Sequence, residues 1–205
     1  MIRISPRPEP PNFDIMVRQR GRRFLSSVPK PTNKQFQKKA FWQFAMSDLQ
    51  SAYGGICAYT CYYIIADPSV DHFLPKSRYP NLAYEWSNYR LARQLVNQHK
   101  GDSLEVLDPF NIQTGWFVMD FPSCLVRPSN GLPAVLTEQI NKSIKILKIN
   151  EYDAFVQERC DLMLAFAEKN ISFKFLSERY PFIASEIVRQ GIQQNTARDL
   201  FKRRI

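Results

Sequence analysis

The sequence is short of cysteine and of long apolar runs, and each shortage excludes a class of protein. Only four cysteines occur in 205 residues, so a small domain held together by disulfide bonds is not expected. No apolar run approaches the roughly 20 residues that cross a bilayer, and the first residues lack the apolar centre of a signal peptide. The ATP-binding pattern G-x-x-x-x-G-K-[ST] is also absent. We therefore expect a globular, cytoplasmic protein without a membrane segment.

Positive charge is in excess, and the excess is concentrated at both ends of the chain. The formal net charge is +9. Residues 1–40 hold ten Lys or Arg against two acids. The last eight residues add four more basic side chains: Arg198, Lys202, Arg203 and Arg204. Because such a surface attracts polyanions, nucleic acid is the expected partner; a solvated surface, an acidic membrane and an acidic protein are the alternatives.

Prolines and glycines divide the first half of the chain. Residues 1–32 carry six prolines, which have no amide donor, so this segment is predicted to be an extended basic arm. Asn33 is a suitable N-cap for a helix that continues to residue 53, where Gly54 and Gly55 would end it. Residues 56–73 predict short strands or a hairpin, and around Asp71 to Lys100 the predicted order is strand, proline-containing loop, strand and helix.

The C-terminal third is predicted to be helical, which makes the chain α+β. The stretch GWFVMDF is the best later strand, and apolar residues recur at helical spacing after Pro133. Asn150 is a candidate cap for one helix, Ser172 for another, and Pro181 should break the last one. We divide the chain into three segments: 1–32, 33–128 and 129–205.

One of only two histidines, His72, lies in the stretch VDHFLPKS directly after Asp71. A neutral imidazole can take a proton from water, and a divalent cation can stabilise the leaving oxygen of a phosphodiester. Asp71 and Asn97 offer oxygen ligands for such a cation. On a regular strand Asp71 and His72 point to opposite faces, so a shared site requires the strand to end or twist before Pro75.

The segment VDHFLPKSRYPNLAYEWSNYRLARQLVNQHKG resembles the HNH endonucleases, the ββα-metal nucleases. The resemblance covers residues 56–101 and is carried by DHFLPKS, NLAYEWSNYRLA and NQHKG. More loosely, IRISPRPEPPNFD, LDPF and GWFVMDFPS are similar to a bacterial subgroup associated with retrons and Septu-type phage defence. The resemblance implies a ββα-metal core and a metal-dependent endonuclease of an anti-phage system that cleaves DNA.

The resemblance also implies a role for each candidate residue. His72 would activate water, Asn88 would orient the loop, Lys100 would bind phosphate, and Asp71 and Asn97 would hold one metal ion. Two oxygen ligands favour Mg²⁺ or Mn²⁺ over zinc. Further contacts with nucleic acid would come from the other basic side chains of the motif: Lys76, Arg78, Arg90, Arg93 and His99.

The cysteines depart from the pattern of many HNH nucleases, which hold a structural zinc with two Cys-x-x-Cys pairs. Cys57 and Cys61 have three residues between them instead of two, and Arg93 stands where the third thiolate would fall. Cys124 and Cys160 are not spaced to complete four ligands. A structural zinc is therefore not expected, and aromatic packing would replace it.

Two alternatives remain open. The chain could be an RNA-cleaving nuclease, acting on tRNA within a complex that contains an ABC-type ATPase and retron components. It could instead be a non-catalytic module that holds nucleic acid or a partner through its basic arm and C-terminal helices. Nothing in the residues separates a DNA substrate from an RNA substrate.

Overall fold

The structure, a computed structural model, describes residues 1–121, 123–194 and 197. The described residues combine helices with two small antiparallel sheets, so the predicted α+β class is confirmed. The basic residues predicted at the C-terminal end lie outside the described residues: Arg198, Lys202, Arg203 and Arg204. No helix in the described part of the chain has both the length and the apolar character needed to cross a membrane.

The chain forms two compact units, which we describe separately. The hairpin unit contains residues 5–58 and 64–104. The C-terminal unit contains residues 1–4, 59–63 and 105–205. The predicted division into segments at residues 32 and 128 stays a prediction.

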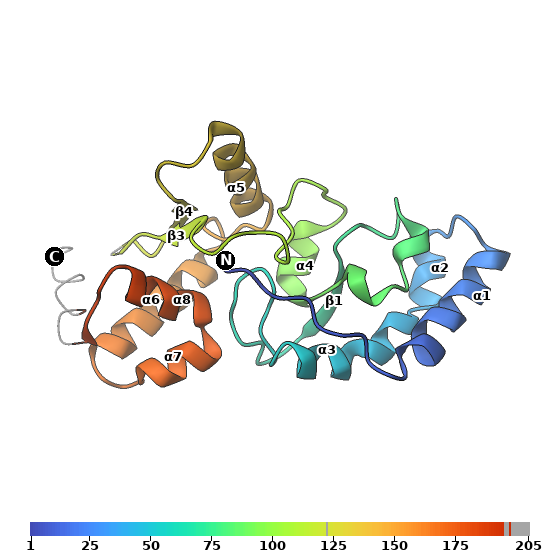
Figure 1. The fold of residues 1–205 in the computed structure, drawn as a ribbon, viewed down its shortest axis with the longest axis horizontal. Coiled ribbons are helices and arrows are strands. Elements are labelled where there is room, and N and C mark those ends of the chain that lie inside the picture. The colour runs from blue at the N-terminus through green and yellow to red at the C-terminus, as the bar shows by residue number, and fades with distance from the viewer. Residues whose placement is uncertain (122, 195–196, 198–205) are drawn as a thin grey trace. The chain divides into compact units, whose positions relative to one another are not determined.

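The hairpin unit carries short helices around one two-stranded sheet (Figure 1). Its elements are, in chain order, η1 (Asp14–Arg18), α1 (Gln19–Ser27), α2 (Asn33–Lys38), η2 (Phe41–Ala45), α3 (Met46–Ala52), β1 (Pro68–His72), η3 (Pro80–Leu82), η4 (Trp86–Asn88), β2 (Tyr89–Arg93) and α4 (Gln94–Lys100).

The predicted extended arm is wrong for residues 14–27, which are helical. Phe13, Val17 and Gly21 recur every four residues and are buried on one side of this helical segment. A Cβ atom at Gly21 would lie 2.1 Å from Cγ of Tyr84, so only glycine allows α1 to approach that ring so closely. Packing of this segment against the rest of the unit therefore stabilises a helix, although the prolines before and after it favour an extended chain.

The predicted helix to residue 53 is broken into α2, η2 and α3. Its N-cap is Thr32 and not Asn33, because the Thr32 hydroxyl accepts from the Gln35 amide while Gln35 bonds back to Thr32. The predicted end is confirmed, since Gly54 and Gly55 follow α3 with φ angles of 58° and 69°.

The predicted order of strand, loop, strand and helix is confirmed, but the hairpin predicted within residues 56–73 is wrong, because only β1 forms there and residues 56–67 are turns and isolated bridges. β1 pairs with β2 in antiparallel register, with Asp71 opposite Arg90 and His72 opposite Tyr89. α4 follows β2 directly and contacts both strands. Gly101, at φ 50°, ends α4.

The described residues of the C-terminal unit contain a second two-stranded sheet followed by helices. Its elements are β3 (Phe117–Met119), β4 (Val126–Pro128), α5 (Ala134–Ile146), α6 (Asp153–Ala167), α7 (Phe173–Arg179) and α8 (Pro181–Arg189). The strand in GWFVMDF is confirmed by β3, the Ser172 cap by its bond to the Phe175 amide, and the break at Pro181 by the start of α8.

The predicted cap at Asn150 is wrong. The N-cap of α6 is Tyr152, which makes no side-chain capping bond. The Asn150 amide instead pairs with the backbone of Val126, accepting at 2.9 Å and donating at 2.7 Å. A long-range contact to β4 thus uses the polar group that local reasoning assigned to the helix.

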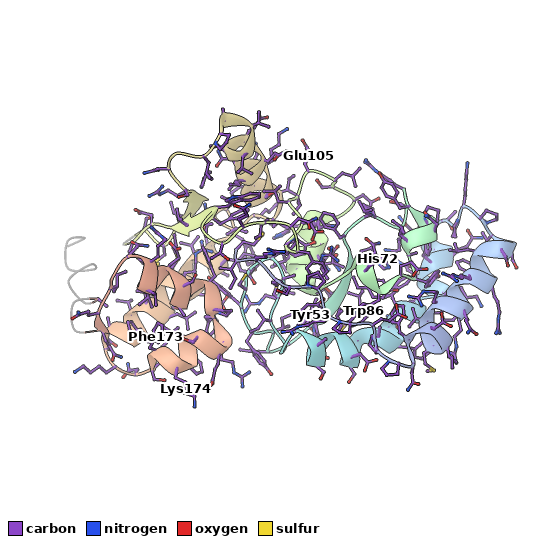
Figure 2. The ribbon with its side chains drawn as sticks, viewed as in Figure 1. Tyr53, His72, Trp86, Glu105, Phe173 and Lys174 are labelled. Carbon is purple, nitrogen blue, oxygen red and sulfur yellow. The ribbon has the colours of Figure 1, made fainter. Side chains whose placement is uncertain are left out.

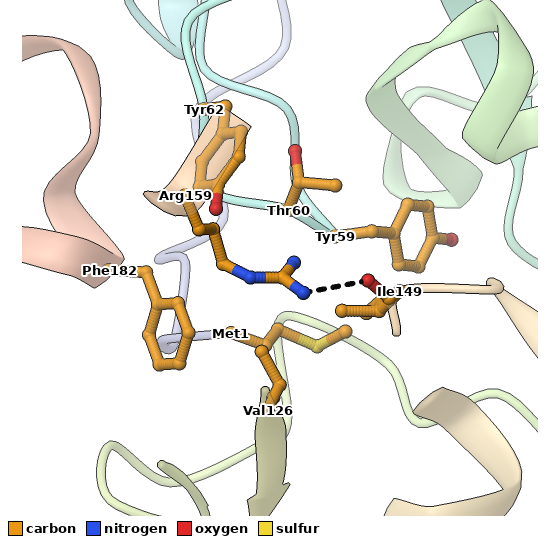
Figure 3. A pocket seen from close by; sticks show the side chains of 8 residues that line it. All are labelled: Met1, Tyr59, Thr60, Tyr62, Val126, Ile149, Arg159 and Phe182. Carbon is orange, nitrogen blue, oxygen red and sulfur yellow. Dashed lines mark hydrogen bonds between the residues drawn. The ribbon is translucent and has the colours of Figure 1, made fainter. Parts of the chain in front are cut away.

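A buried arginine organises the interior of the C-terminal unit (Figure 3). Arg159 of α6 donates to the carbonyl oxygens of Cys124 and Ile149, at 2.6 Å and 3.0 Å, and to Oδ1 of Asn150 at 3.2 Å. The side chain lines a small cavity together with seven others: Met1, Tyr59, Thr60, Tyr62, Val126, Ile149 and Phe182. Among the described residues, the Thr60 hydroxyl is the fully buried side-chain group without a hydrogen-bond partner.

Candidate functional site

The candidate site is built on β1, β2 and α4 of the hairpin unit. Asp71 and His72 end β1, while Asn97 and Lys100 lie three residues apart on α4, on the helix side that faces β1. Figure 2 labels His72 within this unit. The sequence-predicted residues are therefore brought near one strand end, but their side chains have separate partners.

His72 is buried among aromatic rings. Its ring lies edge-on to Trp42, with centroids 4.8 Å apart, and to Tyr89 at 5.3 Å. Its Nε2 lies 2.9 Å from the carbonyl oxygen of Ala83. Because a carbonyl can only accept, Nε2 carries the proton and Nδ1 keeps the lone pair that a general base needs.

The surroundings of His72 hold the imidazole neutral. Burial lowers its pKa to about 3, and the positive charges of Lys76 and Lys100 act in the same direction. A neutral imidazole is the form that can accept a proton. A pKa this low also makes it a weak base, since its protonated form is disfavoured in this environment.

Asp71 is ion-paired with Lys100 on the other face of β1. Lys100 Nζ lies 3.0 Å from Oδ1 of Asp71 and 3.1 Å from the carbonyl oxygen of His72. The side chains of Lys100 and Asp71 are 0% and 2% exposed. Since β1 is regular up to its last residue, Asp71 and His72 point to opposite faces, and the twist that would bring them together is not present.

Asn97 fastens α4 to the same strand. Its Nδ2 donates to Oγ of Ser69 at 3.2 Å and to the carbonyl oxygen of Val70 at 3.3 Å. Both bonds use the amide nitrogen, so Oδ1 of Asn97 remains an acceptor. Asn97 and Lys100 therefore form two successive polar contacts between α4 and β1.

Asn88 ties together the loop between the strands. Its Oδ1 accepts from the amide of Leu74 at 2.8 Å, and its Nδ2 donates to the carbonyl oxygens of Leu74 and Leu82 at 3.0 Å and 3.1 Å. The backbone of Asn88 also accepts from the Phe73 amide. These contacts are what the predicted loop-orienting role would need.

The basic residues of the motif differ in how accessible they are. Lys76 is half-buried, with Nζ 5.3 Å from the ring centroid of Trp42, and burial lowers its pKa. Arg78 is exposed, whereas Arg90 is buried and donates to the carbonyl oxygens of Ser87 and Tyr89. In this arrangement Lys76 and Arg78 can meet a nucleic acid, and Arg90 cannot.

The two remaining predicted contacts, Arg93 and His99, are half-buried. The backbone amide of Arg93 lies 3.5 Å from Sγ of buried Cys57, so the residue at the position of a third thiolate contacts the cysteine through its main chain. His99 lies two residues after Asn97 in the last turn of α4. Their predicted roles on nucleic acid stay predictions.

The oxygen atoms of Asp71 and Asn97 are of the type that binds a divalent cation, but these atoms are not arranged to bind one. Carboxylate and amide oxygens are the ligands that Mg²⁺ prefers. Asp71, however, already neutralises the Lys100 ammonium, which takes the place of a cation on its Oδ1. Across the described residues, no three His, Cys, Asp or Glu side chains are grouped to hold a metal. The residues as placed do not fit the predicted metal ion.

Sequence reasoning missed Trp42 and Tyr89 as the walls around the candidate histidine. Trp42 comes from η2 and Tyr89 from the start of β2, opposite His72 in the sheet register. If the two strands are assumed to pair as a hairpin, their register places Tyr89 opposite His72, so this neighbour could have been identified from the sequence. Trp42 gave no signal beyond being aromatic, because its contact spans 30 residues of sequence.

Comparison of the sequence with models of protein families and with curated proteins finds no match.

Proposed function

We propose that the chain is an HNH-type endonuclease that hydrolyses phosphodiester bonds, with DNA as the favoured substrate. The supporting observation is the connected unit of β1, its loop, β2 and α4. This unit carries the Asp-His pair at a strand end, a bracing Asn in the loop, and the Asn and Lys on the following helix. That is the order and the secondary structure that the HNH resemblance calls for.

Within this proposal, the chemistry of the chain's own residues centres on His72. Nδ1 of His72 would accept the proton of the attacking water, with the ring held by Ala83 behind it. Lys76, the first of the charges that act on His72, would bind a non-bridging phosphate oxygen.

Cleavage assays on supercoiled plasmid, single-stranded DNA and total tRNA test the proposal, each with Mg²⁺, with Mn²⁺ and with EDTA. The His72→Ala variant should lose about 10²- to 10⁴-fold in rate, the usual contribution of a general base. Gln98→Ala, an exposed neighbour on α4, should cleave like the wild type. Cleavage by His72→Ala at the wild-type rate would exclude His72 as the base, and cleavage of tRNA alone would assign an RNA substrate.

A non-catalytic nucleic-acid-binding module is the second candidate, and two features favour it. His72 is a weak base in its buried position, and Asp71 is held by Lys100. This candidate predicts nucleic-acid binding without cleavage of any of the three substrates under any metal condition. It also predicts that His72→Ala leaves binding unchanged.

The resemblance to retron and Septu-type nucleases suggests a place in an anti-phage complex controlled by an ABC-type ATPase. The chain has no ATP-binding loop, so energy-dependent control would have to come from such a partner. Co-purification with an ABC-type ATPase, if a neighbouring gene encodes one, tests this part. If the two proteins do not associate, the ATPase-controlled complex is excluded while the nuclease proposal stands.

A further inference from the structure

Nearly all of the net charge of the chain lies between residues 15 and 47. This stretch of 33 residues holds eight Lys or Arg and no acid, whereas the other 172 residues hold 20 basic and 19 acidic side chains. The chain's charge of +9 is therefore not a general surface property. A local excess of this size is the electrostatic footprint of a surface that binds a polyanion.

Most of these cations are available at the surface of the hairpin unit. Arg18 is ion-paired with Glu9, Asp14 and Glu85, and Arg22 is also paired with Glu85. The remaining six are exposed and make no ion pair with any described residue: Arg20, Arg23, Lys30, Lys34, Lys38 and Lys39. Because these six side chains are exposed and carry no counter-ion from the described residues, they can contact phosphates.

The two helices that carry four of these cations, α1 with Arg20 and Arg23 and α2 with Lys34 and Lys38, are fixed to the candidate site through one aromatic cluster. Phe24 of α1 and Phe36 of α2 each lie 6.4 Å from the ring of Tyr84. Trp42 packs against Tyr84 at 5.9 Å and against His72 at 4.8 Å. A polyanion on α1 and α2 would therefore be held on the same rigid scaffold as the candidate base.

An exposed aromatic ring in this stretch is suited to an unpaired base of a nucleic acid. The guanidinium of Arg20 lies 5.1 Å from the ring centroid of Phe44, and Phe44 is 51% exposed. An accessible ring beside a cation can stack an unpaired base while the cation contacts the backbone. An exposed phenylalanine can also enter a membrane interface, so binding to vesicles is measured as a separate outcome of the test.

We propose that residues 15–47 form the docking surface for nucleic acid, with the six free cations on phosphates and Phe44 stacking an unpaired base. The assignment rests on the proposed function, which needs a substrate held beside His72. It does not require cleavage, however, so the two can fail separately.

The test is fluorescence anisotropy with a labelled 30-nucleotide single strand and the matching duplex, in EDTA and over a series of NaCl concentrations. The surface variant combines Arg23→Ala, Lys34→Ala, Lys38→Ala and Lys39→Ala. For a single strand, each lost phosphate contact should lower the slope of log K against log[salt] by about 0.7, or roughly fivefold in affinity at 0.1 M salt.

The matched control removes four exposed lysines of the C-terminal unit: Lys145, Lys148, Lys169 and Lys174. It changes the net charge by the same amount and should leave the slope close to that of the wild type. Phe44→Ala should weaken the single strand by roughly five- to 100-fold without changing its salt slope, and should leave the duplex nearly unaffected. Circular dichroism checks that each variant is folded.

Two results would overturn the assignment. One is an equal loss of affinity in the surface and control variants, which would mean that only the total charge matters. The other is tight binding to phosphatidylglycerol vesicles with no measurable binding of either oligonucleotide. If the surface variant loses binding while the wild type cleaves nothing, the docking surface stands and the nuclease proposal fails.

Discussion

Lys100 of the hairpin unit and Arg159 of the C-terminal unit are both buried cations, but their charges are compensated differently. In the hairpin unit, Lys100 faces the carboxylate of Asp71. In the C-terminal unit, Arg159 is surrounded by three neutral oxygens, and no carboxylate among the described residues lies within ion-pairing distance. Arginine presents several donors in a fixed fork, so neutral acceptors can hold it in place. The contrast suggests that Arg159 is purely structural, whereas Asp71–Lys100 is a charge pair that another cation could exchange.

The largest effect should come from breaking the charge pair. Lys100→Met removes the ammonium that faces the buried Asp71 carboxylate, which should lower the free energy of unfolding by about 3–5 kcal/mol in urea titrations. The double variant Asp71→Asn/Lys100→Met should regain most of that loss. If Lys100 takes the place of a metal, Mn²⁺ should raise the Tm of Lys100→Met and leave that of the double variant unchanged. No response to Mn²⁺ in Lys100→Met would show that the pair is only structural.

A smaller loss is expected at Arg159, and there geometry should matter more than charge. Arg159→Lys keeps the charge but has one head group in place of the fork, so at least one of the carbonyls of Cys124 and Ile149 loses its donor. We expect about 2–4 kcal/mol of destabilisation, at 1–3 kcal/mol for each buried group left unpaired. Arg159→Leu should cost a similar amount in the same urea titrations. A lysine variant as stable as the wild type would make Arg159 a charge site like Lys100.

Acid should reveal a further property of the hairpin unit, because the pKa of His72 is lowered on folding. The folded pKa of His72 is about 3 against an ordinary value of 6.5, so the unfolded chain binds the extra proton between those values. Stability from this group is therefore present above pH 6.5 and is lost as the pH falls toward 3. From pH 7 to pH 5 the loss should be about 2 kcal/mol. Urea titrations of His72→Gln should lack this part of the pH dependence; an identical dependence in that variant would refute the assignment.

The smallest effect concerns the cavity beside Arg159. Thr60→Val replaces a buried hydroxyl that has no partner with a methyl group of similar shape, and should stabilise the protein by about 1 kcal/mol. Thr32→Val is the contrasting change, because it removes the hydroxyl that caps α2 and should cost about 1 kcal/mol. Differential scanning calorimetry can compare the two. A loss of stability in Thr60→Val would indicate that the hydroxyl binds a water molecule in the cavity.

The parts of the fold that depend on local signals could be predicted from the sequence. The order of β1, loop, β2 and α4 follows from prolines and a terminal glycine, which act within a few positions. The helical segment at residues 14–27 could not be predicted, because it depends on the close contact of Gly21 with Tyr84, 63 residues away. Asn150 was misassigned for the same reason, since its partner Val126 lies on another element.

The residues of the candidate site could be predicted from the sequence, but the pairing of their side chains could not. The residue types near the end of β1 suggested acid, base and phosphate contacts, but spacing alone does not say which side chains will pair. Asp71 and Lys100 are 29 positions apart and have opposite charges, so the same residues serve equally well as ligand and phosphate contact or as each other's counter-ion. In the structure Asp71 and Lys100 form an ion pair with each other.

The bonds of Asn88 have a consequence for the speed of binding. They join the two ends of the segment between β1 and β2, so that segment becomes ordered when the protein folds. An incoming molecule then encounters a finished surface and loses little conformational entropy there on contact. Association at this loop should accordingly be governed by diffusion and electrostatic attraction, with no slow ordering step to wait for.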